Sequence, residues 1–154
     1  MNALEISLLS SNFGLKNFEE MVESSKIRYK SKVFHSKQYN RKGNSNSYAI
    51  SFECREEVEY GEILYFIQHK NIFYVKVQVF SKMHNEILPD EISGFFYGTF
   101  IKFFNKFYSL VDIESSECRY DLIAVDQIKH KCILINYKNN FFHITNVVYD
   151  YEHD

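Results

Sequence analysis

The segment between residues 59 and 80, EYGEILYFIQHKNIFYVKVQVF, constrains the fold of this chain more than any other part of it. Its second half alternates like a β-strand with one buried face, with Phe73, Val75, Val77 and Val79 on one side and Tyr74, Lys76 and Gln78 on the other. In its first half, residues 61–69, both sides of the alternation are apolar, as in a central strand covered on both faces. Lys70 and Asn71 lie between the two halves, and asparagine tolerates the positive φ of a two-residue turn. The segment therefore predicts an antiparallel hairpin in the middle of a β fold.

Shorter segments with β patterning predict further strands, at 27–35, 48–54, 107–113, 120–128, 132–137 and 141–148. The first of these mixes basic and apolar residues, which suits an edge strand, because lysine at an edge discourages unwanted pairing. Residues 138–140 connect the last two strands as a second hairpin. We count about seven short strands, and their regular spacing is typical of a barrel or a sandwich.

Two segments have helical features. Asn17 and Glu20 have the spacing of a capping box and predict a short helix through FEEMVES, residues 18–24. In residues 90–106 the apolar side chains have helical spacing, but two glycines and many aromatic residues weaken a helix. Helix and strand both stay open there, and we interpret the segment as a helix near 90–105.

The fold class that follows is mainly β: a small, partly open barrel or two packed antiparallel sheets, with a short N-terminal helix and the helix near 90–105. We divide the chain into an N-terminal arm at 1–25, a single β-rich domain at 26–150 and a tail at 151–154. A chain of 154 residues buries enough surface to fold without disulfides or metals.

Composition indicates how the turns are built and in which cellular environment the protein is expected. With one proline and only five glycines, most turns must be built from asparagine, aspartate, serine and lysine. The three cysteines lie far apart without a CxxC motif, which indicates reduced thiols in an intracellular protein. The beginning of the chain lacks the basic region of a signal peptide. The longest uncharged aromatic run, residues 92–101, is shorter than the roughly 20 residues of a membrane span, so we expect no membrane partner.

Charge is unevenly distributed although the net charge is only −2. Residues 26–42 contain seven lysines and arginines and no acid, whereas residues 53–62 contain five glutamates and one arginine. The basic segment is interleaved with Tyr29, Phe34, His35 and Tyr39, and such a pattern can contact phosphates with its cations and stack bases on its rings. The candidate nucleic-acid contacts are Lys30, Lys32, Lys37, Arg41 and Lys42. The alternative is a solvated edge strand and loop that charge keeps soluble.

Aromatic residues make up 18% of the chain, so an aromatic cage for a methylated ammonium group is a second possibility for binding. The rings that we single out are Tyr39 and Tyr48, which flank the loop at 40–47, and Tyr60 at the start of a strand. Each is more often a partly buried tyrosine with its hydroxyl group in water. Gly61, next to Tyr60, suggests a bulge or a close approach of two backbones.

Catalytic motifs are missing from the sequence. It has no Gly-x-Ser-x-Gly elbow and no glycine-rich phosphate loop. No two of the six histidines have metal-ligand spacing on a helix, and His130 with Cys132 supplies only two ligands, fewer than a zinc site needs. We therefore predict a protein that is not an enzyme, with no catalytic residues, no metal and no cofactor.

Three stretches together resemble a known class of module. FHSKQYNRKGNSNSYAISF, EYGEILYFI and LIAVDQIKHKCILI occur in this order in a region that resembles the β-rich C-terminal domain of CACTA-type transposon proteins. That domain is similar in kind to bromo-adjacent homology (BAH) and Tudor-like modules. The positions that carry the resemblance are His35, Ser36, Tyr39, Arg41, Ser47, Tyr48, Tyr60, Gly61, Ile63, 122–128 and 131–134.

The resemblance covers about residues 30–148 and implies a non-catalytic, nuclear interaction domain that binds chromatin or protein partners. The motifs are mostly β pattern, and no catalytic acidic region of a transposase accompanies them. Three functions stay open. The first is a chromatin or protein interaction module, the second is direct nucleic-acid binding through residues 26–42, and the third is a structural domain that oligomerises. The sequence does not predict an oligomeric state.

Overall fold

The computed structural model describes residues 7, 10, 11, 13, 14, 21–39, 48–83, 104–116 and 118–147. In this part of the chain the structure is mainly β, as predicted. The strands are β1 (Met21–Ser24), β2 (Lys26–Tyr29), β3 (Lys32–His35), β4 (Ala49–Cys54), β5 (Glu57–His69), β6 (Ile72–Val79), β7 (Ser81–Lys82), β8 (Ser109–Asp112), β9 (Arg119–Ala124), β10 (Ile128–Lys138) and β11 (Phe141–Asn146). The described elements also include two short 3-10 turns, η1 (Lys37–Tyr39) and η2 (Val125–Gln127).

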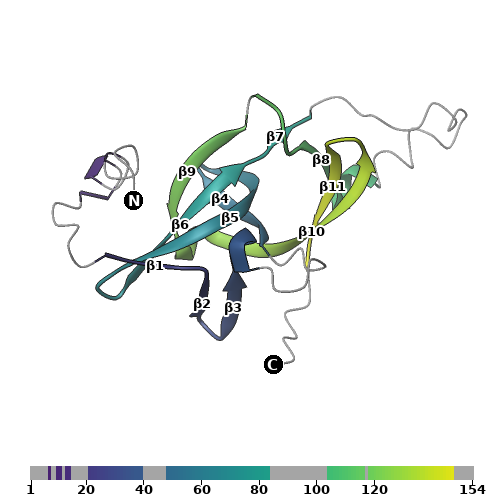
Figure 1. The fold of residues 1–154 in the computed structure, drawn as a ribbon. Coiled ribbons are helices and arrows are strands. Elements are labelled where there is room, and N and C mark those ends of the chain that lie inside the picture. Colours follow the sequence, from purple (N-terminus) through teal and green to yellow (C-terminus); the bar gives the residue numbers. More distant parts are fainter. Residues whose placement is uncertain are drawn as a thin grey trace, which may run out of the picture.

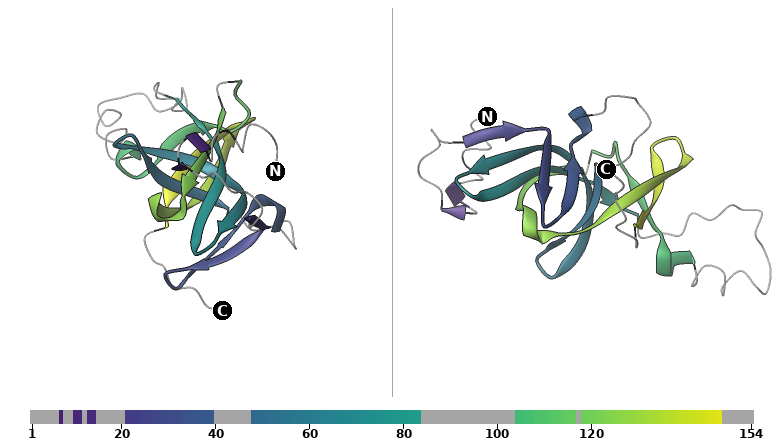
Figure 2. Two further views of the ribbon diagram at one scale, coloured as in Figure 1. Left: turned by 90° about the vertical axis from the view of Figure 1, so that its left-hand side faces the viewer. Right: turned by 90° about the horizontal axis from the view of Figure 1, so that it is seen from below.

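One antiparallel sheet of nine strands carries most of the fold. Its order is β7-β8-β11-β10-β4-β5-β6-β9, and β1 pairs with the far end of β5. Figure 1 shows that the sheet curls, so that β4, β5, β6, β9 and the start of β10 surround a common core as a half-barrel. The β2–β3 hairpin forms a second sheet beside it, and Figure 2 shows the same arrangement from two further sides.

The predicted central hairpin is confirmed, and it supplies the largest part of the core. β5 and β6 pair from Gly61 to His69 around the turn at Lys70 and Asn71. The valines of β6 face inward with β4 and β5 side chains, and the fully buried members of this cluster are Ile50, Phe52, Ile63, Phe66, Val75 and Val77. A second cluster, which includes Phe80, Val111, Leu134 and Ile144, lies between the later strands. The long strands β5 and β10 connect the two clusters.

The opposite face of β6 is also covered, which the sequence did not predict. Tyr74 and Lys76 are both buried, at 3% and 5% exposure. Phe13 and Met21 pack against a small cluster around Tyr74, and the rings of Phe13 and Tyr74 lie 4.5 Å apart. Phe13 and Met21 therefore cover the part of this face around Tyr74.

Three sequence predictions about single elements are wrong. Residues 27–35 form two strands and not one edge strand, because Lys30 and Ser31 make a tight turn with φ of 46° and 67°. The helix predicted over 18–24 does not extend to Met21–Ser24, which form β1 of the main sheet. Helical residues occur earlier instead, at Ser7, Ser10, Ser11 and Phe13. The count of about seven strands is too low, since short strands such as β7 have too few residues to show a pattern.

The strands predicted at 48–54, 107–113 and 120–128 and the second hairpin are confirmed as β4, β8, β9 and β10–β11. Residues 104–107 are helical, and the rest of the helix predicted near 90–105 lies outside the described residues. The loop predicted at 40–47 lies outside them as well. Among the described residues, no helix is both long enough and apolar enough to cross a membrane.

Candidate nucleic-acid interface

A hollow of about 100 Å³ lies between the β2–β3 hairpin and the start of β10. Most of the charged groups in its lining are cations from these two segments, which are far apart in the sequence. The lining includes Lys30, Lys32, Lys129, His130 and Lys131, the rings of Tyr29 and Phe34, and one carboxylate, Asp126. We call this site the basic hollow. Only the fold brings its two groups of lysines together.

The hairpin side of the basic hollow is fixed by two apolar residues. Ile27 of β2 and Phe34 of β3 are paired across the hairpin, and both are buried in the core of the half-barrel. Backbone contact adds to this anchor, because the Ser36 N–H donates to the Ser25 carbonyl at 2.8 Å. With its apolar face held in the core, the hairpin presents its basic residues at the surface, and Lys30 at the turn is exposed.

The β10 side is fixed by η2 and by an irregular strand register. The Gln127 side chain accepts a hydrogen bond from the Ala124 N–H and donates one to the Glu53 carbonyl. Between Ile128 and His130 the register of β10 against β4 shifts. Such a bulge redirects side chains, and here Lys129 and His130 are both exposed although they are neighbours in the strand.

Each of three aromatic rings on this side of the molecule has a lysine ammonium close to it. Lys30 Nζ lies 5.2 Å from the ring centroid of Tyr29, and Lys131 Nζ lies 5.5 Å from that of Phe34. The third pair joins Lys26 Nζ to Tyr39, also at 5.5 Å. These distances are within the range of cation–π attraction, so the ring faces attract the ammonium groups.

The pKa of His35 reflects the positive charge of this surface. Burial lowers its pKa from the usual 6.5, and the charges of Lys26 and Lys131 lower it further. The ring stacks on Tyr39 with 4.6 Å between centroids and an angle of 6° between the planes. Near neutral pH His35 is therefore an uncharged member of a cationic surface.

The five predicted nucleic-acid contacts are placed differently by the structure. Lys30 and Lys32 line the basic hollow. Lys37 instead forms an ion pair with Glu62, whose side chain is only 4% exposed. Arg41 and Lys42 lie outside the described residues.

The structure also shows contributors that the sequence did not indicate as nucleic-acid contacts, namely Lys129, His130 and Lys131 of β10. Lys129 forms an ion pair with Glu53. The sequence KHK in residues 129–131 was the available indication, but a short basic run inside a strand is common and does not reveal that a hairpin a hundred residues earlier lies beside it.

The three predicted cage tyrosines do not present equivalent open rings. Tyr39 stacks on His35. Tyr60 packs against the second core cluster, accepts a hydrogen bond from Ser109 Oγ at 3.4 Å, and has Lys82 Nζ 5.9 Å from its ring centroid. Tyr48 is half-buried, and its carbonyl accepts the Ile63 N–H. The faces of Tyr39 and Tyr60 are thus already in contact with groups of the chain itself.

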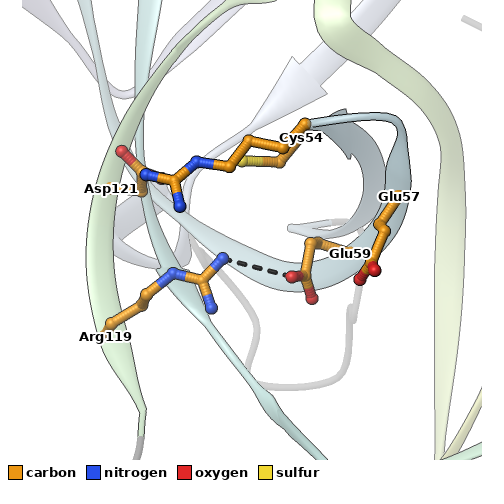
Figure 3. A pocket seen from close by; sticks show the side chains of 6 residues that line it. Cys54, Glu57, Glu59, Arg119 and Asp121 are labelled. Atoms are coloured by element: carbon orange, nitrogen blue, oxygen red, sulfur yellow. Dashed lines mark hydrogen bonds and ion pairs between the residues drawn. The ribbon is translucent and has the colours of Figure 1, made fainter.

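A second, larger hollow of about 490 Å³ lies between the β4–β5 turn and the first residues of β9. Figure 3 shows Arg119 and Asp121 projecting from β9 toward Cys54, Glu57 and Glu59. Arg119 donates to Glu59 at 3.2 Å, and Lys82 approaches the same carboxylate at 3.6 Å. This hollow contains three carboxylates and two arginines, so its charge is very different from that of the basic hollow.

The cysteine thiols and the possible metal ligands of the described residues have ordinary structural environments. All three cysteines are free thiols, and burial raises the pKa of Cys132 to about 12. Within the described part of the chain, no three side chains of histidine, cysteine, aspartate or glutamate are grouped so that they could hold a metal ion.

The BAH-like resemblance and the transposon origin inferred from it stay predictions. Comparison of the chain with family models, curated proteins and solved structures finds no match.

Proposed function

We propose that this chain is a non-enzymatic interaction module that binds nucleic acid through the basic hollow. The observation that carries the proposal is the meeting of Lys30 and Lys32 with Lys129 and Lys131 around one depression. Phosphate groups of a nucleic acid are recognised by clusters of this kind, because each contact releases condensed counterions from the polymer. A net charge of −2 does not oppose this function, since binding depends on the local field.

The distribution of the acidic groups supports the same proposal. Of the five glutamates in residues 53–62, Glu57 and Glu59 line the second hollow, and Glu62 is buried against Lys37. These three glutamates therefore lie away from the basic hollow, whereas Asp126 lines it and Glu53 pairs with Lys129 beside it. Such a separation of charge orients the molecule toward a polyanion before contact.

Nucleic acid ranks above the chromatin-protein and oligomerisation functions because it is the one for which the structure brings the required groups together. A methyl-lysine cage requires several open ring faces directed at one point, and Tyr39 and Tyr60 have their own contacts. Binding to a protein or chromatin partner, a nuclear location and oligomerisation stay predictions.

The direct test is fluorescence anisotropy with labelled single-stranded and duplex DNA at several salt concentrations. With about three phosphate contacts, the affinity for duplex should fall about 40-fold between 50 and 200 mM salt. Lys30→Ala and Lys131→Ala should each weaken binding roughly tenfold near 0.1 M salt, for every DNA sequence alike.

Two controls separate this result from a general effect of charge. Lys70→Ala removes an exposed lysine from the β5–β6 turn and should leave affinity unchanged. Circular dichroism should show that all variants are folded. The proposal fails if the wild-type chain does not bind either DNA at 50 mM salt, or if Lys70→Ala weakens binding as much as Lys30→Ala does.

A further inference from the structure

The rings beside the basic hollow have a structural feature that bears on how a nucleic acid is recognised there. Tyr29, Phe34 and Tyr39 hold the ammonium groups of Lys30, Lys131 and Lys26 at 5.2 to 5.5 Å from their centroids. We call Lys26, Lys30 and Lys131 the ring-seated lysines, because the ammonium group of each lies over an aromatic ring. The sequence pattern suggested that the same rings stack on bases, and the two roles exclude each other at one ring face.

The rings have little free surface apart from the faces occupied by lysine. Phe34 is a member of the core and is only 4% exposed. Tyr29 packs against the same core cluster. Tyr39 stacks in parallel on His35, so one of its faces is covered by another ring. A base could stack on any of them only by displacing an ammonium group or by opening the core.

A phosphate group meets no such obstacle. An ammonium group over a ring still has N–H groups that point away from the ring, and these can donate hydrogen bonds to phosphate oxygens. The ring restricts the motion of the long lysine side chain, so less conformational freedom is lost when a phosphate binds. The position of the ammonium groups over the rings therefore favours contact with the backbone of a nucleic acid and disfavours contact with its bases.

We propose that the basic hollow binds the phosphodiester backbone of nucleic acids without stacking on bases, so that it recognises DNA and RNA independently of sequence. This inference rests on the proposed function and specifies its ligand. Lys30, Lys32 and Lys131, which line the hollow, contact successive phosphates, and the rings of Tyr29 and Phe34 support the ammonium groups of Lys30 and Lys131. Among the described residues of the lining, Asp126 is the one carboxylate, and it keeps phosphates away from its own part of the hollow.

The decisive probe is an oligomer of abasic deoxyribose phosphates, which has the backbone charges of DNA and no bases. Its affinity is compared by anisotropy with that of oligothymidylate and of a mixed-sequence strand of the same length. Without base stacking, the three affinities should agree within about threefold at equal salt, because the counterion contribution is the same for each. Removing Lys30 or Lys131 should lower the magnitude of the salt slope by about 0.7 for each single strand.

Substitutions of a ring and of a remote lysine distinguish support from stacking. Tyr29→Leu removes the ring and keeps Lys30, so it should weaken all three probes equally and by no more than about threefold. Lys106→Ala is the matched control, since Lys106 lies 5.8 Å from the ring centroid of Phe107 but does not line the hollow. It should leave every affinity unchanged.

The outcomes separate this inference from the proposed function. Equal binding of all three probes supports the inference. If the base-containing strands bind and the abasic oligomer binds more than tenfold more weakly, the inference is overturned while nucleic-acid binding stands. A selective loss of base-containing strands in Tyr29→Leu overturns it in the same way. If none of the probes binds at low salt, the proposed function itself fails.

Discussion

Lys37 shows how much the role of one residue depends on its tertiary neighbours. In the sequence it is one of seven cations in a basic segment, and in the structure it neutralises Glu62, which is 3% exposed. Its amino group also donates a hydrogen bond to that carboxylate. The pairing joins η1 to the middle of β5, a relation that no local pattern reveals.

Lys37→Ala should therefore reduce stability and leave DNA affinity intact. Removing the lysine leaves the Glu62 carboxylate buried without its cation, which should cost about 2 kcal/mol of unfolding free energy in urea titrations. The double variant Lys37→Ala/Glu62→Gln should recover part of this loss, because no buried charge is left. Unchanged stability together with weaker DNA binding would show that Lys37 acts at the interface instead.

Gly61 is a residue whose role the sequence did indicate, as a close approach of two backbones. A Cβ atom at this position would lie 2.5 Å from the Gln78 carbonyl oxygen and 3.3 Å from the Val79 Cα of β6. Both atoms belong to the backbone of a paired strand and cannot move aside cheaply. The absence of a side chain is what allows β5 and β6 to pair here.

Gly61→Ala should destabilise the chain by about 3 kcal/mol, because β6 must shift to relieve the clash. Thermal unfolding is a sufficient measurement. Gly14→Ala is the comparison, since a Cβ there meets nothing within 4 Å and strain comes only from its φ of 66°. A smaller loss in Gly61→Ala than in Gly14→Ala would contradict the packing argument.

His143 gives stability a dependence on pH. It lies among aromatic rings, with the centroids of Phe104 and Tyr137 each 4.9 Å away, and burial lowers its pKa below 6.5. His35 is shifted in the same direction. Between the lowered folded pKa and the unfolded value near 6.5, the unfolded chain binds more protons, so stability rises with pH and is lost on acidification.

Urea unfolding should therefore show lower stability at pH 5.5 than at pH 7.5. His143→Phe keeps a ring among its aromatic neighbours and removes the titrating group, so it should narrow the difference between the two pH values. His130→Phe changes an exposed histidine and serves as the control. Equal or greater stability of the wild-type chain at pH 5.5 would contradict this explanation.

At the scale of elements, the strands in which apolar and polar residues alternate strongly were predictable from the sequence, and the tight turns were not. β4, β5, β6 and β9–β11 follow from residue patterns alone. The β2–β3 hairpin was missed because Lys30–Ser31 lacks the Asn-Gly signature of a two-residue turn. The capping-box spacing predicts a helix where β1 forms, because that spacing is local, whereas the pairing of β1 with β5, such as Met21 with His69, depends on distant residues.

The β4–β5 turn, like the β2–β3 turn, is formed by two non-glycine residues with positive φ. Arg55 and Glu56 both have positive φ, 52° and 69°, a conformation that is unfavourable for residues with a Cβ. Replacing them by Asn-Gly should stabilise the chain by about 1 kcal/mol. The same replacement at Lys30–Ser31 should also stabilise the chain but weaken DNA binding, because Lys30 is lost. Destabilisation by both replacements in urea unfolding would contradict this interpretation of the turns.

At the scale of the whole molecule, the half-barrel holds two differently charged hollows at separate places. The basic hollow joins the hairpin to β10, and the second hollow joins the β4–β5 turn to β9. The sequence indicated the uneven charge and four members of the basic hollow, Tyr29, Lys30, Lys32 and Phe34. It did not indicate Lys129 to Lys131, because their contribution depends on how the sheet curls back on the hairpin (Figure 1).

The central claim is that nucleic acid contacts the basic hollow, and backbone amide NMR during a DNA titration tests it most directly. The amide signals of residues 29–34 and 128–131 should shift progressively and in proportion to one another, since one ligand contacts both segments. The signals of residues 54–59 and 119–121, around the second hollow, should stay in place. Shifts confined to the second hollow, or no shifts at DNA concentrations well above that of the protein, would contradict the claim.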